Sequence, residues 1–199
     1  MIAAIILAAG QSSRMGQHKL LLPVLGKPLL LHAVDNATAA GFDDLLVVVG
    51  YHADAVRKLL TNRPVRVIEN TAYAQGQSTS LRAGIAALAP QTAAAVLLLG
   101  DQPLVNPAIL KRLMRAWQDT AKPIVVPFYG GQRGNPVLFA RALFPELLSV
   151  TGDQGGREIL QQHAQEIEPV YIADADAAQD LDTWQDYQAL LKRLEQTIE

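Results

Sequence analysis

The sequence predicts an α/β protein with a Rossmann-like, three-layer α/β/α arrangement around a mostly parallel sheet. Over residues 1–128, short apolar runs alternate without interruption with segments of helical spacing. Such alternation is typical of parallel sheets covered by helices on both faces. The chain has 199 residues, half of them hydrophobic, which suits one large domain with a sizeable core. No repeat or low-complexity linker divides it, so we expect a single domain over residues 1–199.

Each predicted strand is a short apolar run, and two of the predicted helices carry clear boundary signals. Gly41 stands in the C-terminal capping position of one helix, and Asn106-Pro107 combines an N-cap with proline at the first helical position of another. The predicted strands span residues 2–7, 45–49, 65–68, 94–99, 124–127, 137–139 and 170–173. The predicted helices span residues 29–40, 53–60, 77–88, 107–119, 141–148, 156–164 and 183–196, and residues 180–183 form a short extended piece.

The composition excludes several classes of protein. A formal net charge of −2 argues against a general binder of nucleic acid or membrane surfaces. The chain has no cysteine, which excludes disulfides, thiolate nucleophiles and cysteine metal sites. The N-terminal apolar run is too short to span a membrane, and no basic segment precedes it. We therefore expect a cytoplasmic protein.

The first predicted strand runs into a loop that is suited to binding an anion. The loop reads Leu7-Ala8-Ala9-Gly10-Gln11-Ser12-Ser13-Arg14-Met15-Gly16, and Lys19 follows it. Small residues let the backbone approach a ligand, and consecutive N–H groups in such a turn point at anions. Arg14 offers a planar fork for phosphate oxygens, and Lys19 adds a point charge. The loop is neither a Walker loop nor a G-x-G-x-x-G turn, and an ordinary βα loop with two surface cations is the alternative.

A carboxylate follows the predicted strand at residues 94–99. Asp101 lies in Gly100-Asp101-Gln102-Pro103, just past the end of that strand, where ligands bind in open parallel sheets. Mg²⁺ prefers one or two carboxylates together with the phosphates of a substrate. Asp101 is therefore a candidate metal ligand, and a turn-forming aspartate before Pro103 is the alternative.

Two further aspartates precede the last predicted helix. Asp180 and Asp182 alternate along an extended piece, which puts both carboxylates on one face. They repel each other unless a cation or water lies between them. A second interpretation, compatible with the first, makes Asp182 or Thr183 the N-cap of the helix and Asp186 a charge in its first turn.

Three hydroxyl side chains gather where the predicted helix at residues 77–88 begins. Ser78, Thr79 and Ser80 follow a turn at Gly76, and hydroxyls and free N–H groups at a helix N-terminus suit a phosphate or the edge of a base. The alternative is Ser78 as a simple N-cap. Residues 133–139 and 152–157 read by themselves as loop and strand.

The loop from Leu7 to Lys19 resembles the signature loop of nucleotidyltransferases of the MobA-like NTP transferase family. These enzymes activate sugars, lipids and cofactors with a nucleoside triphosphate. The two alanines before Gly10 are similar to the branch that contains the molybdenum cofactor cytidylyltransferases, whereas the guanylyltransferase branch more often has Leu-Ala-Gly-Gly. The resemblance runs from Ile6 to the final helix.

Three later segments carry the same resemblance, with departures. Asp180-Leu181-Asp182-Thr183 is similar to the family's Asp-Ile-Asp-Thr, although Trp184-Gln185 stands where Pro-Glu is usual. Gly76 to Leu81 resembles the family's Gly-x-x-x-Ser-Leu. The segments at residues 133–139 and 152–157 look like the cytidylyltransferase branch, with Asn135 in place of a usual histidine and Gly156 in place of a usual alanine.

The resemblance implies an enzyme that moves a nucleoside monophosphate, CMP from CTP, to a phosphate-bearing acceptor and releases pyrophosphate, with Mg²⁺ as cofactor. The implied acceptor is molybdopterin or its molybdenum-loaded form. The nucleotide would bind to about residues 1–128 and the acceptor to about 129–199. The resemblance leaves room for a molybdoenzyme as protein partner and implies no nucleic acid or membrane partner.

The resemblance also assigns roles to residues. The catalytic residues are Arg14, Lys19 and Asp101. The nucleotide-binding residues are Leu7, Ala8, Ala9, Gly10, Arg14, Lys19, Gly76, Ser78, Ser80 and Asp101. The metal ligands are Asp101 and Asp182, with Asp180 in reserve. The acceptor-binding residues are Asn135, Pro136, Gly155 and Arg157.

Three other functions stay open. A transferase of the same fold could serve another small phosphorylated acceptor. An NAD(P)-dependent oxidoreductase belongs to a different enzyme class, and the spacing of Gly10 and Gly16 speaks against it. A non-catalytic chaperone of the molybdenum cofactor would not need both Asp101 and Asp182.

Overall fold

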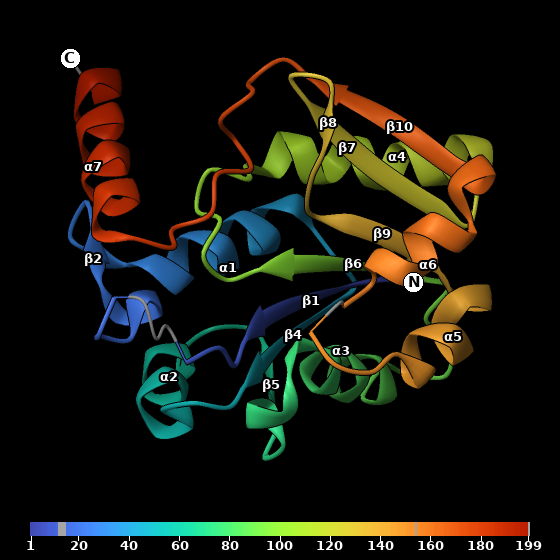
Figure 1. The fold of residues 1–199 in the computed structure, drawn as a ribbon, viewed down its shortest axis with the longest axis horizontal. Helices are drawn as coiled ribbons and strands as arrows, with labels where there is room; N and C mark the ends of the chain where they lie inside the picture. The colour runs from blue at the N-terminus through green and yellow to red at the C-terminus, as the bar shows by residue number, and fades with distance from the viewer. Residues whose placement is uncertain (12–14, 154, 199) are drawn as a thin grey trace.

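The computed structural model describes residues 1–11, 15–153 and 155–198, and it confirms the predicted fold class (Figure 1). A mixed sheet of eight strands has the order β10-β7-β9-β6-β1-β4-β5, with β8 paired to β7. Its strands are β1 (Ile2–Ala8), β4 (Asp44–Val49), β5 (Arg66–Glu69), β6 (Ala94–Leu99), β7 (Ile124–Tyr129), β8 (Gln132–Arg133), β9 (Val137–Ala140) and β10 (Ile167–Ile172). A separate hairpin pairs β2 (Pro23–Val24) with β3 (Lys27–Pro28).

Helices cover both faces of the sheet, because its central strands are apolar on both sides. Along β1, Ala4 and Ile6 belong to one buried cluster, whereas Ala3 and Ile5 belong to the other. The first cluster receives side chains from α1 (Leu29–Ala40), α2 (Ala53–Leu60), α4 (Pro107–Thr120) and α7 (Trp184–Ile198). The second receives side chains from α3 (Gln77–Ala86), α5 (Phe144–Ser149) and α6 (Arg157–Gln162). Figure 1 shows α1 and α4 on one side of the sheet and α3 and α5 on the other.

The strand order reverses beside β1. From β1 the chain continues to β4 and β5 on one side, and β6 then pairs with β1 on its other side, parallel throughout. The order therefore reverses between β1 and β6. In open α/β sheets, ligands bind outside the carboxyl ends of the strands at such a switch point.

The later part of the chain breaks the parallel pattern. Strand β9 lies between β6 and β7 and is antiparallel to both. Strand β10 then pairs with β7 in parallel at the edge of the sheet. The sheet is thus mostly parallel, as predicted, with β8 and β9 as its antiparallel strands, and β9 carries the chain toward α5 and α6.

The predicted boundary signals act as expected at two helices. The Asn106 Oδ1 atom accepts a hydrogen bond from the Ile109 N–H at 3.1 Å, with Pro107 at the start of α4. Gly41 ends α1 with φ 83°, a left-handed conformation that glycine adopts at little cost. Among the described residues, no helix is long and apolar enough to cross a membrane.

Other boundaries differ from the prediction. The predicted helix at 141–148 is a 3₁₀ turn (Arg141–Leu143) followed by α5, and that at 156–164 is the shorter α6 with a 3₁₀ turn (Ala164–Glu166) after it. Residues 180–183 belong to no strand. The N-cap of α3 is Gly76 and not Ser78. Two more 3₁₀ turns, Lys19–Leu21 and Tyr73–Gln75, flank the switch point.

Candidate active site

A pocket of about 700 Å³ lies at the carboxyl end of β1. We call it the first pocket. Its walls come from the loop after β1, the 3₁₀ turn Tyr73–Gln75 with the start of α3, and the end of β6. The predicted nucleotide-binding residues that line it are Leu7, Ala8, Ala9, Gly10, Lys19, Gly76, Ser80 and Asp101.

A smaller pocket of about 280 Å³, which we call the second pocket, adjoins the first. It lies over the ends of β6 and β9 and the start of α6. Three of the predicted acceptor-binding residues line it, namely Asn135, Gly155 and Arg157. Asp101 and Asp182 line both pockets, so a molecule in either pocket would meet the same two carboxylates.

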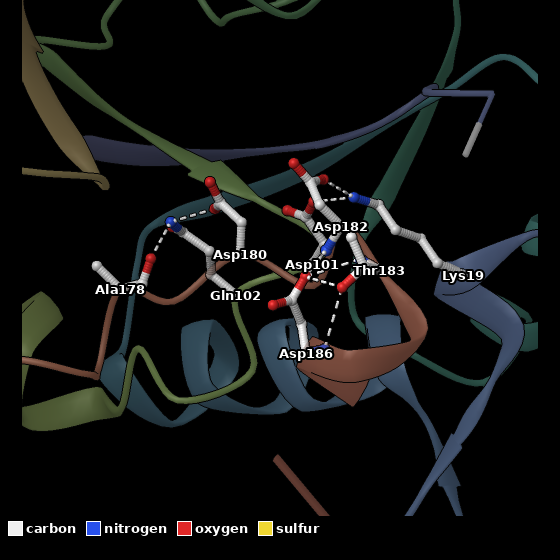
Figure 2. Close-up of polar contacts among 8 residues, drawn as sticks. All are labelled: Lys19, Asp101, Gln102, Ala178, Asp180, Asp182, Thr183 and Asp186. Atoms are coloured by element: carbon white, nitrogen blue, oxygen red, sulfur yellow. Dashed lines mark hydrogen bonds and ion pairs between the residues drawn. The ribbon is translucent and has the colours of Figure 1, made fainter. Parts of the chain in front are cut away.

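Lys19 joins these two carboxylates (Figure 2). Its Nζ atom lies 2.5 Å from Asp101 Oδ2 and 2.9 Å from Asp182 Oδ1. The side chains of Lys19 and Asp101 are each 15% exposed, and that of Asp182 is 44% exposed. Burial by itself lowers the pKa of Lys19, but the charge of Asp101 and hydrogen bonds to both carboxylates outweigh it and raise the pKa above its usual value. The ammonium is therefore charged at neutral pH.

A local hydrogen-bond network shapes the backbone at Asp182. The Asp186 Oδ2 atom accepts hydrogen bonds from the backbone N–H groups of Asp182 at 3.2 Å and Thr183 at 2.7 Å. The Thr183 hydroxyl in turn accepts from the Asp186 N–H at 3.2 Å, which makes a reciprocal cap at the start of α7. Thr183 as cap and Asp182 as site residue are thus compatible, and the hydrogen bonds from Thr183 lower the pKa of Asp186.

Contacts with the N-terminal part of the chain hold the same segment in place. Leu181 is 2% exposed and packs in the first core cluster. The Trp184 Nε1–H group donates to the Met15 carbonyl at 3.2 Å, and the Tyr187 hydroxyl donates to the Pro23 carbonyl. These contacts bring the start of α7 to the loop that carries Lys19.

Gln102 contacts a side chain of the second pocket, a role that the sequence did not point to. Its side chain is buried and donates from Nε2 to the Ala178 carbonyl at 2.8 Å and to Asp180 Oδ1 at 2.7 Å (Figure 2). Asp180 lines the second pocket. Partial burial and the charge of Asp101 raise the pKa of Asp180, against the hydrogen bond from Gln102. The position of Gln102 directly after Asp101 is the signal that could have indicated this role.

The start of α3 is arranged differently from what its sequence suggested. The Asn70 amide donates to Thr79 Oγ1 at 2.8 Å and to Ser80 Oγ at 2.9 Å. Ser78 is buried, at 1% exposure, and is not among the described residues that line either pocket. The first N–H of the helix, that of Gln77, donates to Asp153 Oδ1 at 3.1 Å. A loop from the C-terminal part of the chain therefore occupies this helix end.

One other predicted site residue among those that the structure describes is not brought into the pockets. Pro136 is not among the residues that line the second pocket, although Asn135 is. Arg14 lies outside the described residues, so its role stays a prediction. Tyr73, which no motif singled out, lines the first pocket beside Gly76.

The donor set around Lys19 fits a divalent metal ion. One ammonium contacts both Asp101 and Asp182, so the two carboxylates converge on a single cation position. Carboxylate oxygens are the ligands that hard divalent cations prefer. No group of three or more such ligands occurs in the part of the chain that the structure describes. The remaining ligands would come from water and substrate phosphates, as is usual for Mg²⁺.

Curated relatives resemble this chain over most of its length. It is 30% identical over 187 residues to the molybdenum cofactor cytidylyltransferase of Escherichia coli K12. The aligned region covers 94% of this chain and 93% of that protein. It is 28% identical to the nicotine blue oxidoreductase of Paenarthrobacter nicotinovorans, which covers 96% of both. The bifunctional protein GlmU of Shouchella clausii is 33% identical over 163 residues, and the chain spans about a third of that protein's length.

Solved structures show the same fold. Rv0371c of Mycobacterium tuberculosis has a TM-score of 0.86 and 35% identity and covers 96% of this chain and 97% of its own. A manganese complex of Rv0371c has a TM-score of 0.79 and 34% identity, with coverage of 96% and 98%. The nucleotidyl transferase Mth528 from Methanothermobacter has a TM-score of 0.85 and 25% identity and covers 99% of both chains.

Residues 4–193 match the family described as the MobA-like NTP transferase domain. The family match spans nearly the whole chain, and it includes the loop after β1 and both aspartates that Lys19 joins. With the cytidylyltransferase relative at 30% identity, it shows that this chain belongs to the MobA-like NTP transferase family and is a nucleotidyltransferase.

Proposed function

We propose that this enzyme transfers CMP from CTP to the phosphate of molybdopterin, or of its molybdenum-loaded form, in a Mg²⁺-dependent reaction that releases pyrophosphate. The observation that carries the proposal is the meeting of two pockets at one pair of carboxylates, Asp101 and Asp182. A nucleotide in the first pocket and an acceptor in the second would face each other there.

The proposed reaction is an in-line exchange at phosphorus. An oxygen of the acceptor phosphate forms a bond to the α-phosphorus of CTP, and the bond between that phosphorus and the bridging oxygen of pyrophosphate breaks. The electron pair of the broken bond leaves with pyrophosphate. No protein nucleophile is needed, so positioning and charge neutralisation supply most of the catalysis.

The residues of the site have separate tasks in this proposal. Ala8, Ala9 and Gly10 line the first pocket, where their backbone would approach the nucleotide. Lys19, and Arg14 by prediction, neutralise charge that builds on the leaving pyrophosphate. Asp101 and Asp182 would hold the divalent metal, which, when bound, neutralises phosphate charge and helps align the reacting groups. The manganese complex of Rv0371c supports a divalent metal in this family.

The second pocket suits an acceptor that has both apolar and charged parts. Leucines and Phe139 form much of its wall, and Arg157 and Asn135 add a cation and an amide. An arginine guanidinium is well matched to phosphate oxygens. The E. coli cytidylyltransferase at 30% identity supports molybdopterin as the acceptor. A molybdoenzyme partner stays a prediction from the resemblance.

An oxidoreductase is the second candidate function, because the P. nicotinovorans relative with 28% identity is named as one. It would use NAD(P), yet the loop after β1 lacks the dinucleotide turn. Titrating the protein with NADPH and NADH, and following quenching of protein fluorescence, separates the two functions. Tight nicotinamide binding without CTP binding would favour the oxidoreductase.

The test of the proposed function is a pyrophosphate release assay. Pure protein is incubated with each nucleoside triphosphate, Mg²⁺ and molybdopterin, and pyrophosphate and the dinucleotide product are both measured. We expect release that requires molybdopterin and is fastest with CTP. Release with another phosphorylated acceptor alone would keep the transferase and change the acceptor, whereas formation of the dinucleotide with GTP alone would contradict the cytidylyl assignment.

A further inference from the structure

We propose that the Lys19 ammonium occupies the cation position between Asp101 and Asp182, so that the site binds a divalent metal well only when a nucleotide is present. The inference rests on the proposed function, because it takes both aspartates as metal ligands. It adds a second task for Lys19, which is to exclude free metal ions.

The Lys19 ammonium contacts both carboxylates that a metal ion would use. Lys19 Nζ lies 2.5 Å from Asp101 Oδ2 and 2.9 Å from Asp182 Oδ1, so it stands between the two oxygens that a metal would use. Mg²⁺ binds carboxylate oxygens at about 2.0–2.1 Å. A metal at that distance from both oxygens would overlap the place of the ammonium, and the two cations would repel each other. The ammonium must therefore leave before a metal can bind both carboxylates.

In the absence of a nucleotide, the Lys19 ammonium leaves the aspartates only at a cost in free energy. Lys19 and Asp101 are both largely shielded from solvent, with side chains 15% exposed. Separating a shielded ion pair leaves each charge with fewer compensating contacts, which is costly in free energy. A free metal ion would have to overcome this cost in addition to losing part of its own hydration shell.

A nucleotide in the first pocket would offer the Lys19 ammonium a new partner. Lys19 lines the first pocket together with Gly10 and Gln11. Its backbone is held in a 3₁₀ turn, in which the Leu22 N–H donates to the Lys19 carbonyl at 3.1 Å, and the next residue, Leu20, is buried. The flexible four-carbon stem can nevertheless turn its ammonium. The phosphates of a nucleotide in this pocket would replace the aspartates as its counter-ions.

Metal and nucleotide therefore bind with positive coupling. A nucleotide that draws Lys19 away from the aspartates raises the affinity for metal, and by reciprocity the metal raises the affinity for the nucleotide. The cation position is then filled by Lys19 in the resting enzyme and by a metal in the loaded one. Both carboxylates keep a counter-charge in either state.

The test is the binding of Mn²⁺ alone, measured from the electron paramagnetic resonance signal of the free ion, without nucleotide. Lys19→Met removes the ammonium and keeps the apolar stem. We expect this variant to bind one Mn²⁺ about tenfold or more tightly than the wild type, the scale on which neighbouring groups tune metal affinity. Lys27→Met is the matched control: Lys27 pairs with Asp35 at 2.9 Å and is not among the described residues lining either pocket. It should bind Mn²⁺ as the wild type does.

Two outcomes would overturn the inference. One is equal Mn²⁺ affinity in the wild type and Lys19→Met. The other is an equal gain in Lys27→Met, which would show a non-specific effect of charge. If Lys19→Met does not fold, as judged by circular dichroism, Lys19→Gln replaces it in the same measurement.

A further pair of variants distinguishes the exclusion of metal by Lys19 from the binding of metal by the aspartates. Asp101→Asn, made in the wild type and in Lys19→Met, should weaken Mn²⁺ binding in both. If it does so while Lys19→Met shows no gain in Mn²⁺ affinity, Lys19 does not exclude the metal ion. The metal site at the aspartates, and with it the proposed function, is then retained. If Asp101→Asn changes Mn²⁺ binding in neither background, Asp101 is not a metal ligand. That outcome contradicts both the metal site of the proposed function and the exclusion of metal by Lys19.

Discussion

The Asp186 carboxylate accepts hydrogen bonds from both the backbone N–H and the hydroxyl of Thr183, each at 2.7 Å. Because Thr183 directly follows Asp182, this contact sets the backbone from which Asp182 reaches Lys19 (Figure 2). A residue outside both pockets thus helps to position a carboxylate inside them.

Replacing Asp186 with alanine should weaken metal activation more than it weakens folding. Loss of the cap should lower the free energy of unfolding by about 1 kcal/mol, and the freed Asp182 should raise the Mg²⁺ concentration needed for half-maximal activity. Asp186→Asn keeps an acceptor oxygen and should restore part of both. The control is Asp54→Ala, which removes an exposed acidic side chain from the first turn of α2. An unchanged Mg²⁺ requirement in Asp186→Ala would limit its role to stability.

The three aspartates of the site should rank in a definite order when each becomes asparagine. Asp101→Asn and Asp182→Asn should lose most of the turnover at limiting Mg²⁺, since a neutral amide is a poorer Mg²⁺ ligand. Both aspartates contact the Lys19 ammonium. Asp180→Asn should have a milder effect, because Asp180 accepts from Gln102. The measurement is turnover as a function of Mg²⁺ concentration. A larger loss in Asp180→Asn than in Asp182→Asn would move the second ligand to Asp180.

Removing the Ala9 methyl group should relax the preference for CTP over GTP without inverting it. Ala9 lines the first pocket and is packed closely at the end of β4, where a Cβ built on Gly50 would lie 2.9 Å from Ala9 Cβ. A pyrimidine needs less room there than a purine. One methyl group is worth about 1–3 kcal/mol of discrimination. The ratio of kcat/KM for CTP and GTP, in the wild type and in Ala9→Gly, checks this. An unchanged ratio would show that the Ala9 methyl group does not discriminate between the two nucleotides.

Arg157→Ala should raise the KM for the acceptor and leave the KM for CTP unchanged. Arg157 lines the second pocket and not the first, among the residues described. A hydrogen bond to a charged group contributes about 1.5–3 kcal/mol, so a rise in acceptor KM of at least about tenfold is expected. Arg115→Ala, at a side chain that is 83% exposed, is the control. Equal rises for both substrates would place Arg157 in a shared structural role.

The contribution of His163 to stability should fade as the pH rises. Hydrogen bonds to Glu166 at 2.7 Å and Glu146 at 2.9 Å raise the pKa of His163 above 6.5. A raised pKa stabilises the fold fully below the unfolded value of about 6.5, and this stabilisation is lost as the pH passes the folded value. The Tm difference between the wild type and His163→Gln should therefore be larger at pH 6 than at pH 9. A difference that does not change with pH would contradict the ion pairs.

The local features of this protein could be read from its sequence, because each depends on residues close together in the chain. Apolar runs gave the strands, Asn106-Pro107 and Gly41 marked two helix ends, and Asp101 stood past the end of β6. Motif resemblance went further and identified the family that the match over residues 4–193 confirmed. Its assignments for the individual site residues stay predictions.

Only the tertiary structure decided how distant residues meet. Lys19 and Asp182 are 163 positions apart in the sequence, yet they share an ion pair because the start of α7 packs against the loop after β1. Strand β9 is inserted between β6 and β7 and lines the second pocket beside the first, and its pairing with β6, from which α4 and β7 separate it in the chain, is not set by a local pattern. Gln102 gains its position through partners on a distant segment, the Ala178 carbonyl and Asp180. Periodicity reports the burial of a residue, whereas the choice of its partner depends on the packing of the whole sheet.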